Sequence, residues 1–169
     1  LEPFHEGTSS LRHVANGVEQ LLRPEGVAVL TRVRPGEYVF RHVQGVLQEW
    51  SEFTLAGPSC QLLDELLRRD EVVLFHRRQR TPWAREFLLA AGMAGGALAP
   101  IRAHGEPIGA LLLNHSTAFR FGAEHAAGLQ SLATMAGVAI LEDAQRAKLE
   151  DLFMSVIVSL TMAIEAKDP

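Results

Sequence analysis

The sequence predicts an α+β fold in which an antiparallel sheet is flanked by helices. Two hairpins supply most of the strands, one over 26–44 and one over 97–116; both are rich in apolar residues, and the first also in β-branched ones. Segments with apolar residues at helical spacing precede, separate and follow these hairpins. The order of elements is therefore helix, strand pair, helix, strand, helix, strand pair and long helix.

The first half of the chain divides into a helix, a hairpin, a connection and a second helix. Residues 9–23 carry apolar side chains at helical spacing behind two serines, which are good N-terminal caps. Strands are predicted over 26–33 and 37–44, followed over 45–58 by a connection that holds at most one irregular strand. Residues 60–69 have a leucine stripe that predicts a helix.

The second half begins with a short strand over 71–75 and a polar loop. A Thr-Pro start signal then predicts a helix over 83–92. The hairpin of 97–104 and 107–116 has an almost wholly apolar second strand, which must be covered on both faces. After Gly122 the chain favours one long helix of about 45 residues, about 65 Å, or two helices in sequence.

Composition excludes several classes of function. The net charge of −4 gives no general attraction to phosphate backbones, so we expect no nucleic-acid partner. A single cysteine excludes a disulfide framework and a thiolate-rich zinc site, and fits a reducing cytoplasm. No apolar run approaches the roughly 20 residues of a membrane helix, so no membrane partner is expected.

Residues 92–140 resemble the second half of a GAF domain. In that family a strand that ends in Pro is followed by a turn centred on Gly and by a strand that contains Ile-Gly. Here these features fall at Pro100, Gly105 and Ile108-Gly109, and Phe121 and an Ala-rich helix follow. This resemblance implies a six-stranded antiparallel GAF/PAS-like sheet with helices on both faces and a long C-terminal signalling helix. It also implies a ligand cavity on the face opposite the terminal helices.

Residues 150–169 resemble the lead-in helix of HD-GYP domains, which hydrolyse cyclic di-GMP at a metal centre. The run from Ser159 to Pro169 matches that lead-in, and the metal-binding histidines would follow it. We therefore expect a flank over 1–8, a GAF sensor domain over 9–145 and a signalling helix over 146–169. On this interpretation the chain is a sensory and regulatory domain of a bacterial signalling protein and is not itself an enzyme.

Aromatic and basic residues in the segments that would wall the cavity are the candidate ligand-binding residues. The aromatic members suit an apolar pocket, and the basic members suit a phosphate or carboxylate. The alternatives are that the aromatic rings only fill the core and that the loop is simply solvated. The candidates are Trp50, Phe53, Phe75, His76, Arg78, Trp83 and Phe87.

Other ligand classes receive less support. The seven histidines show no i, i+4 pair, so no metal site is predicted, although haem ligation by His76 or His115 stays open. Cys60 is a candidate for bilin attachment, but Gln61 follows it where bilin-binding relatives commonly carry His. No cofactor is therefore predicted, and the cyclic-nucleotide signature of some GAF domains is absent.

The C-terminal helix carries an apolar stripe that one domain cannot cover along its whole length. A parallel homodimer through this helix, with a contribution of the N-terminal helix also open, would cover it. Either the paired helices transmit a ligand signal, or the chain is a dimerisation module with a filled cavity. The stripe consists of Leu129, Leu132, Ala136, Ile140 and Ala147, then Leu149, Phe153, Val156, Leu160 and Ala163.

Overall fold

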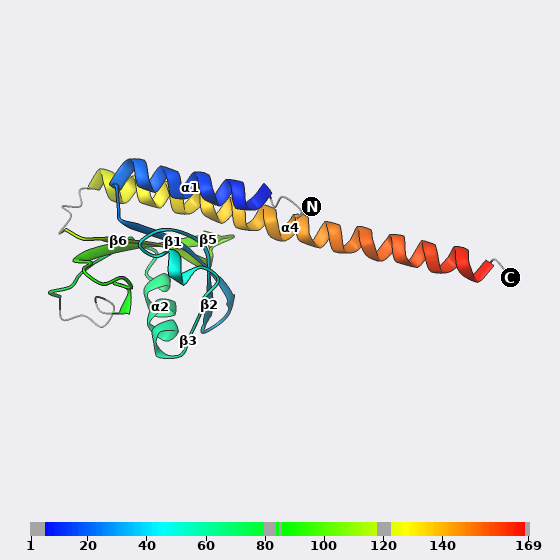
Figure 1. Cartoon of the computed structure of the whole chain (residues 1–169), viewed down its shortest axis with the longest axis horizontal. Helices are drawn as coiled ribbons and strands as arrows, with labels where there is room; N and C mark the ends of the chain where they lie inside the picture. Colours follow the sequence, from blue (N-terminus) through cyan, green and yellow to red (C-terminus); the bar gives the residue numbers. More distant parts are fainter. Residues whose placement is uncertain (1–5, 80–83, 85, 118–122, 168–169) are drawn as a thin grey trace.

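The computed structural model describes residues 6–79, 84, 86–117 and 123–167. One six-stranded antiparallel sheet has the strand order β3-β2-β1-β6-β5-β4, so the first and last hairpins meet at its centre (Figure 1). The elements are α1 (Glu6–Leu22), β1 (Gly26–Arg34), β2 (Glu37–Gly45), η1 (Gln48–Trp50), β3 (Thr54–Ala56), α2 (Pro58–Arg68), β4 (Val73–His76), β5 (Gly95–Ala103), β6 (Glu106–His115) and α4 (Ala123–Lys167).

The hairpin of β5 and β6 closes through the two residues His104 and Gly105. Both have positive φ, 51° and 81°, which is the requirement of a two-residue turn that matches the twist of the strands. The turn was expected at Gly105-Glu106, but Glu106 already pairs with Ala103 in the ladder. The last predicted hairpin is thus confirmed, with its turn displaced by one residue.

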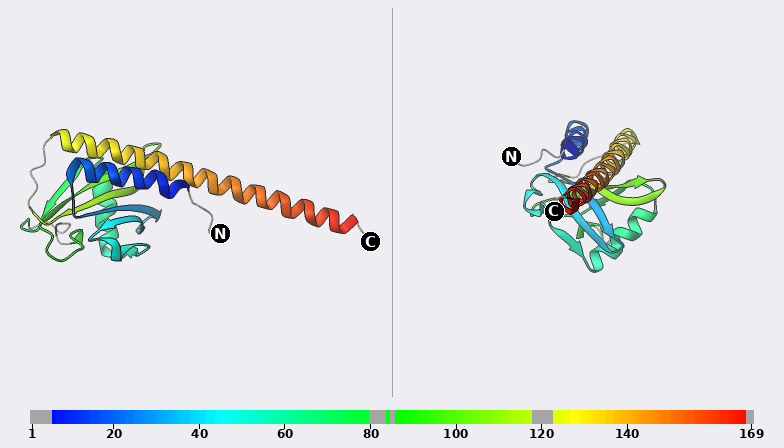
Figure 2. Two further views of the ribbon diagram at one scale, coloured as in Figure 1. Left: turned by 45° about the horizontal axis from the view of Figure 1, so that its top comes forward. Right: turned by 90° about the vertical axis from the view of Figure 1, so that its right-hand side faces the viewer.

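The sheet is covered on both faces, which makes three layers (Figure 2). On one face α1 and α4 run antiparallel over the central strands, where Val29 and Leu111 belong to the core beneath them. On the other face α2 packs its buried Leu63 and Leu66 into a second core that includes Leu112. The predicted α+β fold with helices on both faces is confirmed.

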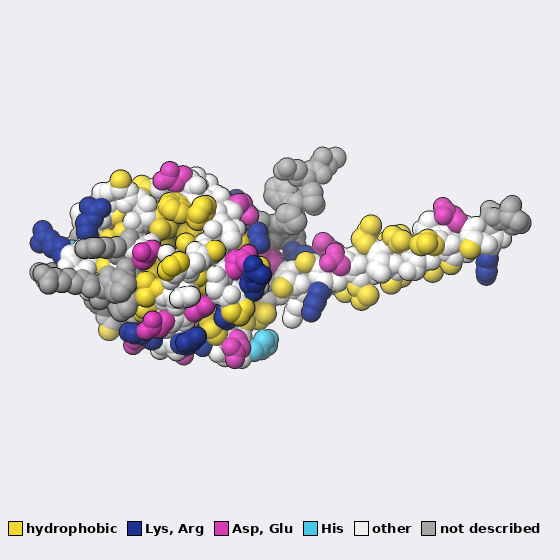
Figure 3. All heavy atoms as spheres, turned by 90° about the horizontal axis from the view of Figure 1, so that it is seen from below, with side chains coloured by type: hydrophobic (Ala, Val, Ile, Leu, Met, Phe, Trp, Pro, Cys, Tyr) yellow, Lys and Arg dark blue, Asp and Glu magenta, His cyan; other side chains and the backbone are white. Residues whose placement is uncertain are grey.

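The long helix α4 changes surroundings along its 45 residues. Its first half buries Leu129, Ala133 and Ala136 against the sheet and α1. From Ala144 to Lys167 every described residue is exposed, and the helix projects away from the domain with apolar side chains on its surface (Figures 1 and 3). Nowhere in the described part of the chain is a helix both long enough and apolar enough for a membrane span.

The backbone of α4 lies directly against the backbone of β5 at Gly137. A Cβ atom on Gly137 would lie 2.4 Å from the backbone oxygen of Arg102 in β5, so only glycine fits without movement. On the opposite face, the guanidinium of Arg102 donates to the backbone oxygen of Leu67 at 2.6 Å and pairs with Asp70 at 2.6 Å. Arg102 therefore touches both helical layers, through its backbone and its side chain respectively.

Two polar side chains tie the α2 layer to the sheet. Asp64 of α2 accepts hydrogen bonds from the Tyr38 hydroxyl and from the backbone N–H of Gly36. Burial, followed by this hydrogen bond, raises the pKa of Tyr38, which keeps the hydroxyl protonated as a donor. Asn114 of β6 is fully buried and donates to the backbone oxygen of Phe87 at 2.8 Å, which holds the segment before β5 over the sheet.

Several boundaries differ from the sequence prediction. The first helix begins at Glu6, so Ser9 and Ser10 lie within it and do not cap it. The strand expected over 71–75 spans 73–76, and the irregular strand of the connection is β3. The helix expected over 83–92 is wrong from Phe87 onward, because Asn114 captures the backbone groups of this segment that a helix would use internally.

The fit of Gly137 against β5 predicts that Gly137→Ala lowers the free energy of unfolding by about 1–3 kcal/mol, because the new methyl group meets backbone. Alanine is more favourable than glycine inside a helix by about 1 kcal/mol, so a net loss of stability would have to come from the contact with β5. Gly128→Ala is the matched control, because its Cβ would meet only the end of the Leu21 side chain. Urea denaturation of both variants checks this, and equal stabilities would contradict the tight contact.

Candidate ligand pocket

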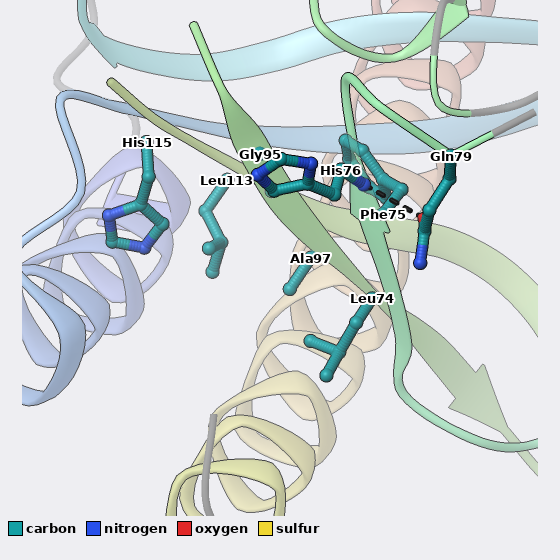
Figure 4. Close-up of a pocket in the computed structure, with 9 residues that line it drawn as sticks. Leu74, Phe75, His76, Gln79, Gly95, Ala97, Leu113 and His115 are labelled. Carbon is teal, nitrogen blue, oxygen red and sulfur yellow. Dashed lines mark hydrogen bonds between the residues drawn. The ribbon is translucent and has the colours of Figure 1, made fainter. Parts of the chain in front are cut away.

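A pocket of about 200 Å³ lies at the β4 edge of the sheet (Figure 4). Its floor is apolar, and polar groups stand at its ends. The residues that line it are Leu74, Phe75, His76, Gln79, Gly95, Gly96, Ala97, Leu113 and His115.

The register of the three strands explains why these residues meet. Directly paired residues of antiparallel strands point to the same face. One row across β4, β5 and β6 is therefore Leu74, Ala97 and Leu113, and the next is His76, Gly95 and His115. The second row has an imidazole at each end and no side chain at its middle position.

Gly95 keeps the middle of the pocket open. A Cβ atom there would lie 3.1 Å from the backbone oxygen of Phe75 and 3.6 Å from Cδ2 of His76. Figure 4 shows the His76 ring extending over Gly95, with Leu113, Ala97 and Leu74 in a row below it. Any larger residue at position 95 would fill the space between the two histidines.

The turn after β4 fixes the orientation and proton position of His76. The backbone N–H of His76 donates to Gln79 Oε1 at 2.9 Å, and the backbone N–H of Arg78 donates to His76 Nδ1 at 3.2 Å. Because Nδ1 accepts, the proton of the neutral ring is on Nε2. The pocket therefore has a hydrogen-bond donor at His76, and the amide nitrogen of Gln79 supplies further donors.

His115 closes the other end of the pocket and is 5% exposed. Burial lowers its pKa, while Glu25, whose carboxylate lies 3.8 Å from Nδ1, acts in the opposite direction. Glu25 also accepts hydrogen bonds from the backbone and hydroxyl of Ser116. Because burial lowers its pKa, the His115 imidazole is neutral at neutral pH. The carboxylate beside it, that of Glu25, is already hydrogen-bonded to Ser116.

Of the six candidate residues that the structure describes, the pocket includes Phe75 and His76. Phe87 lies behind it, with its ring 6.3 Å from that of Phe75 in the α2-side core. Arg78 is exposed on the turn beside the pocket, and Trp83 lies outside the described residues.

The other two aromatic candidates lie at the opposite side of the sheet, where β2 and β3 form the far edge. Trp50 and Phe53 are 5.0 Å apart between ring centroids, and both contact the ring of Phe40. Phe53 is 47% exposed and Trp50 packs against the α2-side core. The single aromatic-walled cavity expected from sequence is therefore divided into two separate clusters.

The pocket also lies on a different face from the one expected. Ala97 and Leu113 belong to the core beneath α1 and α4, whereas the family resemblance implied a cavity on the α2 side. On the α2 side the described residues pack into a continuous apolar core that includes Phe40 and Phe87. Sequence reasoning missed Leu74, Gln79, Ala97 and Leu113, and it named His115 only as an alternative haem ligand. The pairing of β4 with β5 and of β5 with β6 is the signal that would have brought these residues together.

Neither Cys60 nor any described histidine belongs to a cluster that could hold a metal ion. Cys60 is buried in α2, its thiol donates to the backbone oxygen of Leu55 at 2.9 Å, and burial raises its pKa. In the described part of the chain, no three His, Cys, Asp or Glu side chains gather closely enough to hold a metal ion.

The sheet order and the two helical layers define a small domain of α+β type. Residues 7–140 match the GAF domain family, and the chain belongs to that family. No match was found among curated proteins.

Solved structures share this fold at low sequence identity. A GAF domain/HD domain protein from Geobacter sulfurreducens is 16% identical, with a TM-score of 0.66 over 83% of this chain and 95% of that one. The GAF-B domain of DevS from Mycobacterium smegmatis is 21% identical, with a TM-score of 0.62 over 84% and 98%. The phycoerythrobilin-bound GAF domain of a cyanobacterial phytochrome is 16% identical, with a TM-score of 0.59 over 86% and 98%.

The buried state of His115 predicts a loss of stability on acidification. Because burial lowers its pKa from the ordinary 6.5, the unfolded chain binds the proton more readily. Stability should therefore fall as the pH drops through 6.5 toward the lower pKa of the folded state. His115→Gln should flatten this dependence, measured by urea denaturation between about pH 7 and pH 5.

His42 provides an internal comparison, because burial and Arg12 also lower its pKa. His42→Gln should remove a separate part of the dependence, and the double variant should combine the two effects. An unchanged pH dependence in His115→Gln would contradict the inference that its imidazole is held neutral.

Proposed function

We propose that this GAF domain is the sensory part of a bacterial signal-transduction protein that works in the cytoplasm. A small molecule binds at the β4 edge, and α4 carries the change to an output domain. The observation that carries this proposal is the continuity of α4. The helix that packs against the sheet through Leu129 and Ala136 continues without a break as the exposed segment from Ala144 to Lys167.

A continuous helix supports signalling because it moves as one body. Any shift of the sheet under Gly137 reaches the exposed segment without a flexible joint, since no proline interrupts residues 123–167. Arg102 extends the contact to α2 through its hydrogen bond to Leu67. Ligand binding would then shift an equilibrium between two positions of the helix.

The exposed segment supports a parallel homodimer. Leu149, Phe153, Val156, Leu160 and Ala163 repeat at alternating spacings of four and three, as in a coiled coil. The four larger side chains among them are between 49% and 68% exposed in the single chain. A second copy would remove this apolar surface from water, at roughly 25 cal/mol per Å².

The output domain we propose is an HD-GYP phosphodiesterase acting on cyclic di-GMP. The resemblance of residues 159–169 to the HD-GYP lead-in supports this assignment. A structural neighbour is described as a GAF domain/HD domain protein, which is in line with this assignment. The metal centre and the catalysis would belong to that output domain.

A second candidate is a dimerisation module without a ligand. The observation in its favour is the α2-side core, where Phe40, Leu63 and Phe87 occupy the space in which the family resemblance placed a cavity. A haem or bilin sensor has less support. The pocket of about 200 Å³ is smaller than the roughly 300–1,000 Å³ of ordinary ligand sites, and Cys60 is buried.

The dimer proposal predicts that the double variant Phe153→Glu with Leu160→Glu is monomeric, because it would place like charges opposite each other in the stripe. Thr161→Glu is the matched control, since position 161 lies outside the stripe and the variant should remain dimeric. Sedimentation equilibrium at micromolar concentration measures the outcome. A monomeric unmodified chain would contradict the proposal.

Transmission through α4 can be tested by changing the phase of the helix after Lys148, with the chain joined to an HD-GYP domain. An insertion of seven residues preserves the coiled-coil phase, whereas an insertion of four rotates everything beyond it. Signalling predicts that cyclic di-GMP hydrolysis changes severalfold with the four-residue insertion and little with the seven-residue one. Equal rates in both would favour the dimerisation module.

A further inference from the structure

We infer that the pocket at the β4 edge binds a small monocarboxylic acid with an apolar body. This inference rests on the proposed sensory function, and it names the chemical class of the ligand. Its three supports are the size of the pocket, the apolar row at its floor and the excess of hydrogen-bond donors and positive charge at its mouth.

The size of the pocket sets an upper limit on the ligand. An apolar cavity of about 150 Å³ in another protein holds one benzene molecule. The pocket here, at about 200 Å³, has room for a six-membered ring or a short branched chain with one attached polar group.

The floor of the pocket fits the apolar body of such a molecule. Ala97 and Leu113 are buried, at 1% and 0% exposure, and both present hydrocarbon. Leu74 continues the row at the sheet edge but is 43% exposed. A ligand lying along this row would cover the Leu74 side chain, which nothing else in the described structure does.

The mouth of the pocket favours an anion. His76 carries its proton on Nε2, and the side-chain amide of Gln79 has two N–H groups. Arg77 and Arg78 are exposed on the same turn, so their positive charge opposes a cationic ligand. None of the described residues that line the pocket is acidic. A carboxylate is the group that combines negative charge with acceptors for these donors.

The direct test uses sodium benzoate, with benzyl alcohol as a neutral molecule of similar shape. Both are titrated into the full chain labelled with ¹⁵N, and amide shifts are followed at His76, Gly95, Ala97 and Leu113. We expect benzoate to shift these amides and to bind at least tenfold more tightly than benzyl alcohol, a difference of about 1.4 kcal/mol. Equal affinities, or no shifts with either compound at millimolar concentration, would overturn the inference.

Substitution at Leu74 separates charge from shape. Leu74→Glu places a negative charge at the mouth of the pocket, and Leu74→Gln places a neutral side chain of the same size there. Because Leu74 is already largely exposed, both variants should fold. Benzoate affinity should fall at least tenfold further in Leu74→Glu than in Leu74→Gln, and the same affinity in both would overturn the assignment of an anion.

Substitution of the histidine tests the hydrogen bond. His76→Phe keeps a ring over Gly95 but removes the donor, so benzoate should lose about tenfold in affinity while benzyl alcohol changes little. His42→Phe is the matched control, because His42 lies on β2 at the other side of the sheet and should leave both affinities unchanged. An equal loss for both compounds in His76→Phe would contradict a role in carboxylate recognition.

Failure of this inference is distinguishable from failure of the sensory proposal. If benzoate binds but does not change cyclic di-GMP hydrolysis by a fused HD-GYP domain, the carboxylate site is supported and the sensory role is contradicted. If hydrolysis depends on the phase of the inserted residues but benzoate does not bind, transmission through α4 is supported and the carboxylate site is contradicted.

Discussion

The contact between α4 and the strand β5 is the interaction on which the rest of the structure depends. Gly137 brings the helix backbone against the Arg102 carbonyl, and small residues such as Ala133 and Ala136 let it lie flat on the sheet. This close packing fixes the direction in which α4 leaves the domain. It also joins the output helix to α2, because the Arg102 side chain bonds to the backbone of Leu67.

The candidate pocket exists because the sheet extends beyond the layer that covers it. The helices α1 and α4 lie over the central strands, and the row that contains Leu74 continues past them to the edge. Gly95 then leaves a gap between two histidines that would otherwise be filled by a side chain. The pocket, of about 200 Å³, therefore lies at the edge of the sheet, next to the strand β5 on which α4 packs.

The two halves of α4 have different surroundings. The first half belongs to the core of one chain, while the second exposes apolar side chains to water. One continuous helix thus covers the face of the sheet that holds the pocket and carries the stripe that we propose as the dimer contact. On the other face, the hydrogen bond between Tyr38 and Asp64 ties α2 to the sheet, and the hydrogen bond from Asn114 to Phe87 ties the segment before β5 to it.

The sequence by itself determined the fold class, the two hairpins and the helical character of residues after Gly122, because these follow from local periodicity and turn residues that act within a few positions of each other. That this last stretch is one continuous helix and not two was decided by the structure. It also indicated the family, and it placed Phe75 and His76 among the ligand-binding candidates. The tertiary structure alone decided which side chains share the pocket, since Gly95 and His115 meet His76 only through strand pairing across 19 and 39 positions of chain. It likewise separated Trp50 and Phe53 from that site and ended the helix before Phe87, because long-range hydrogen bonds to Asn114 outweighed local helix propensity.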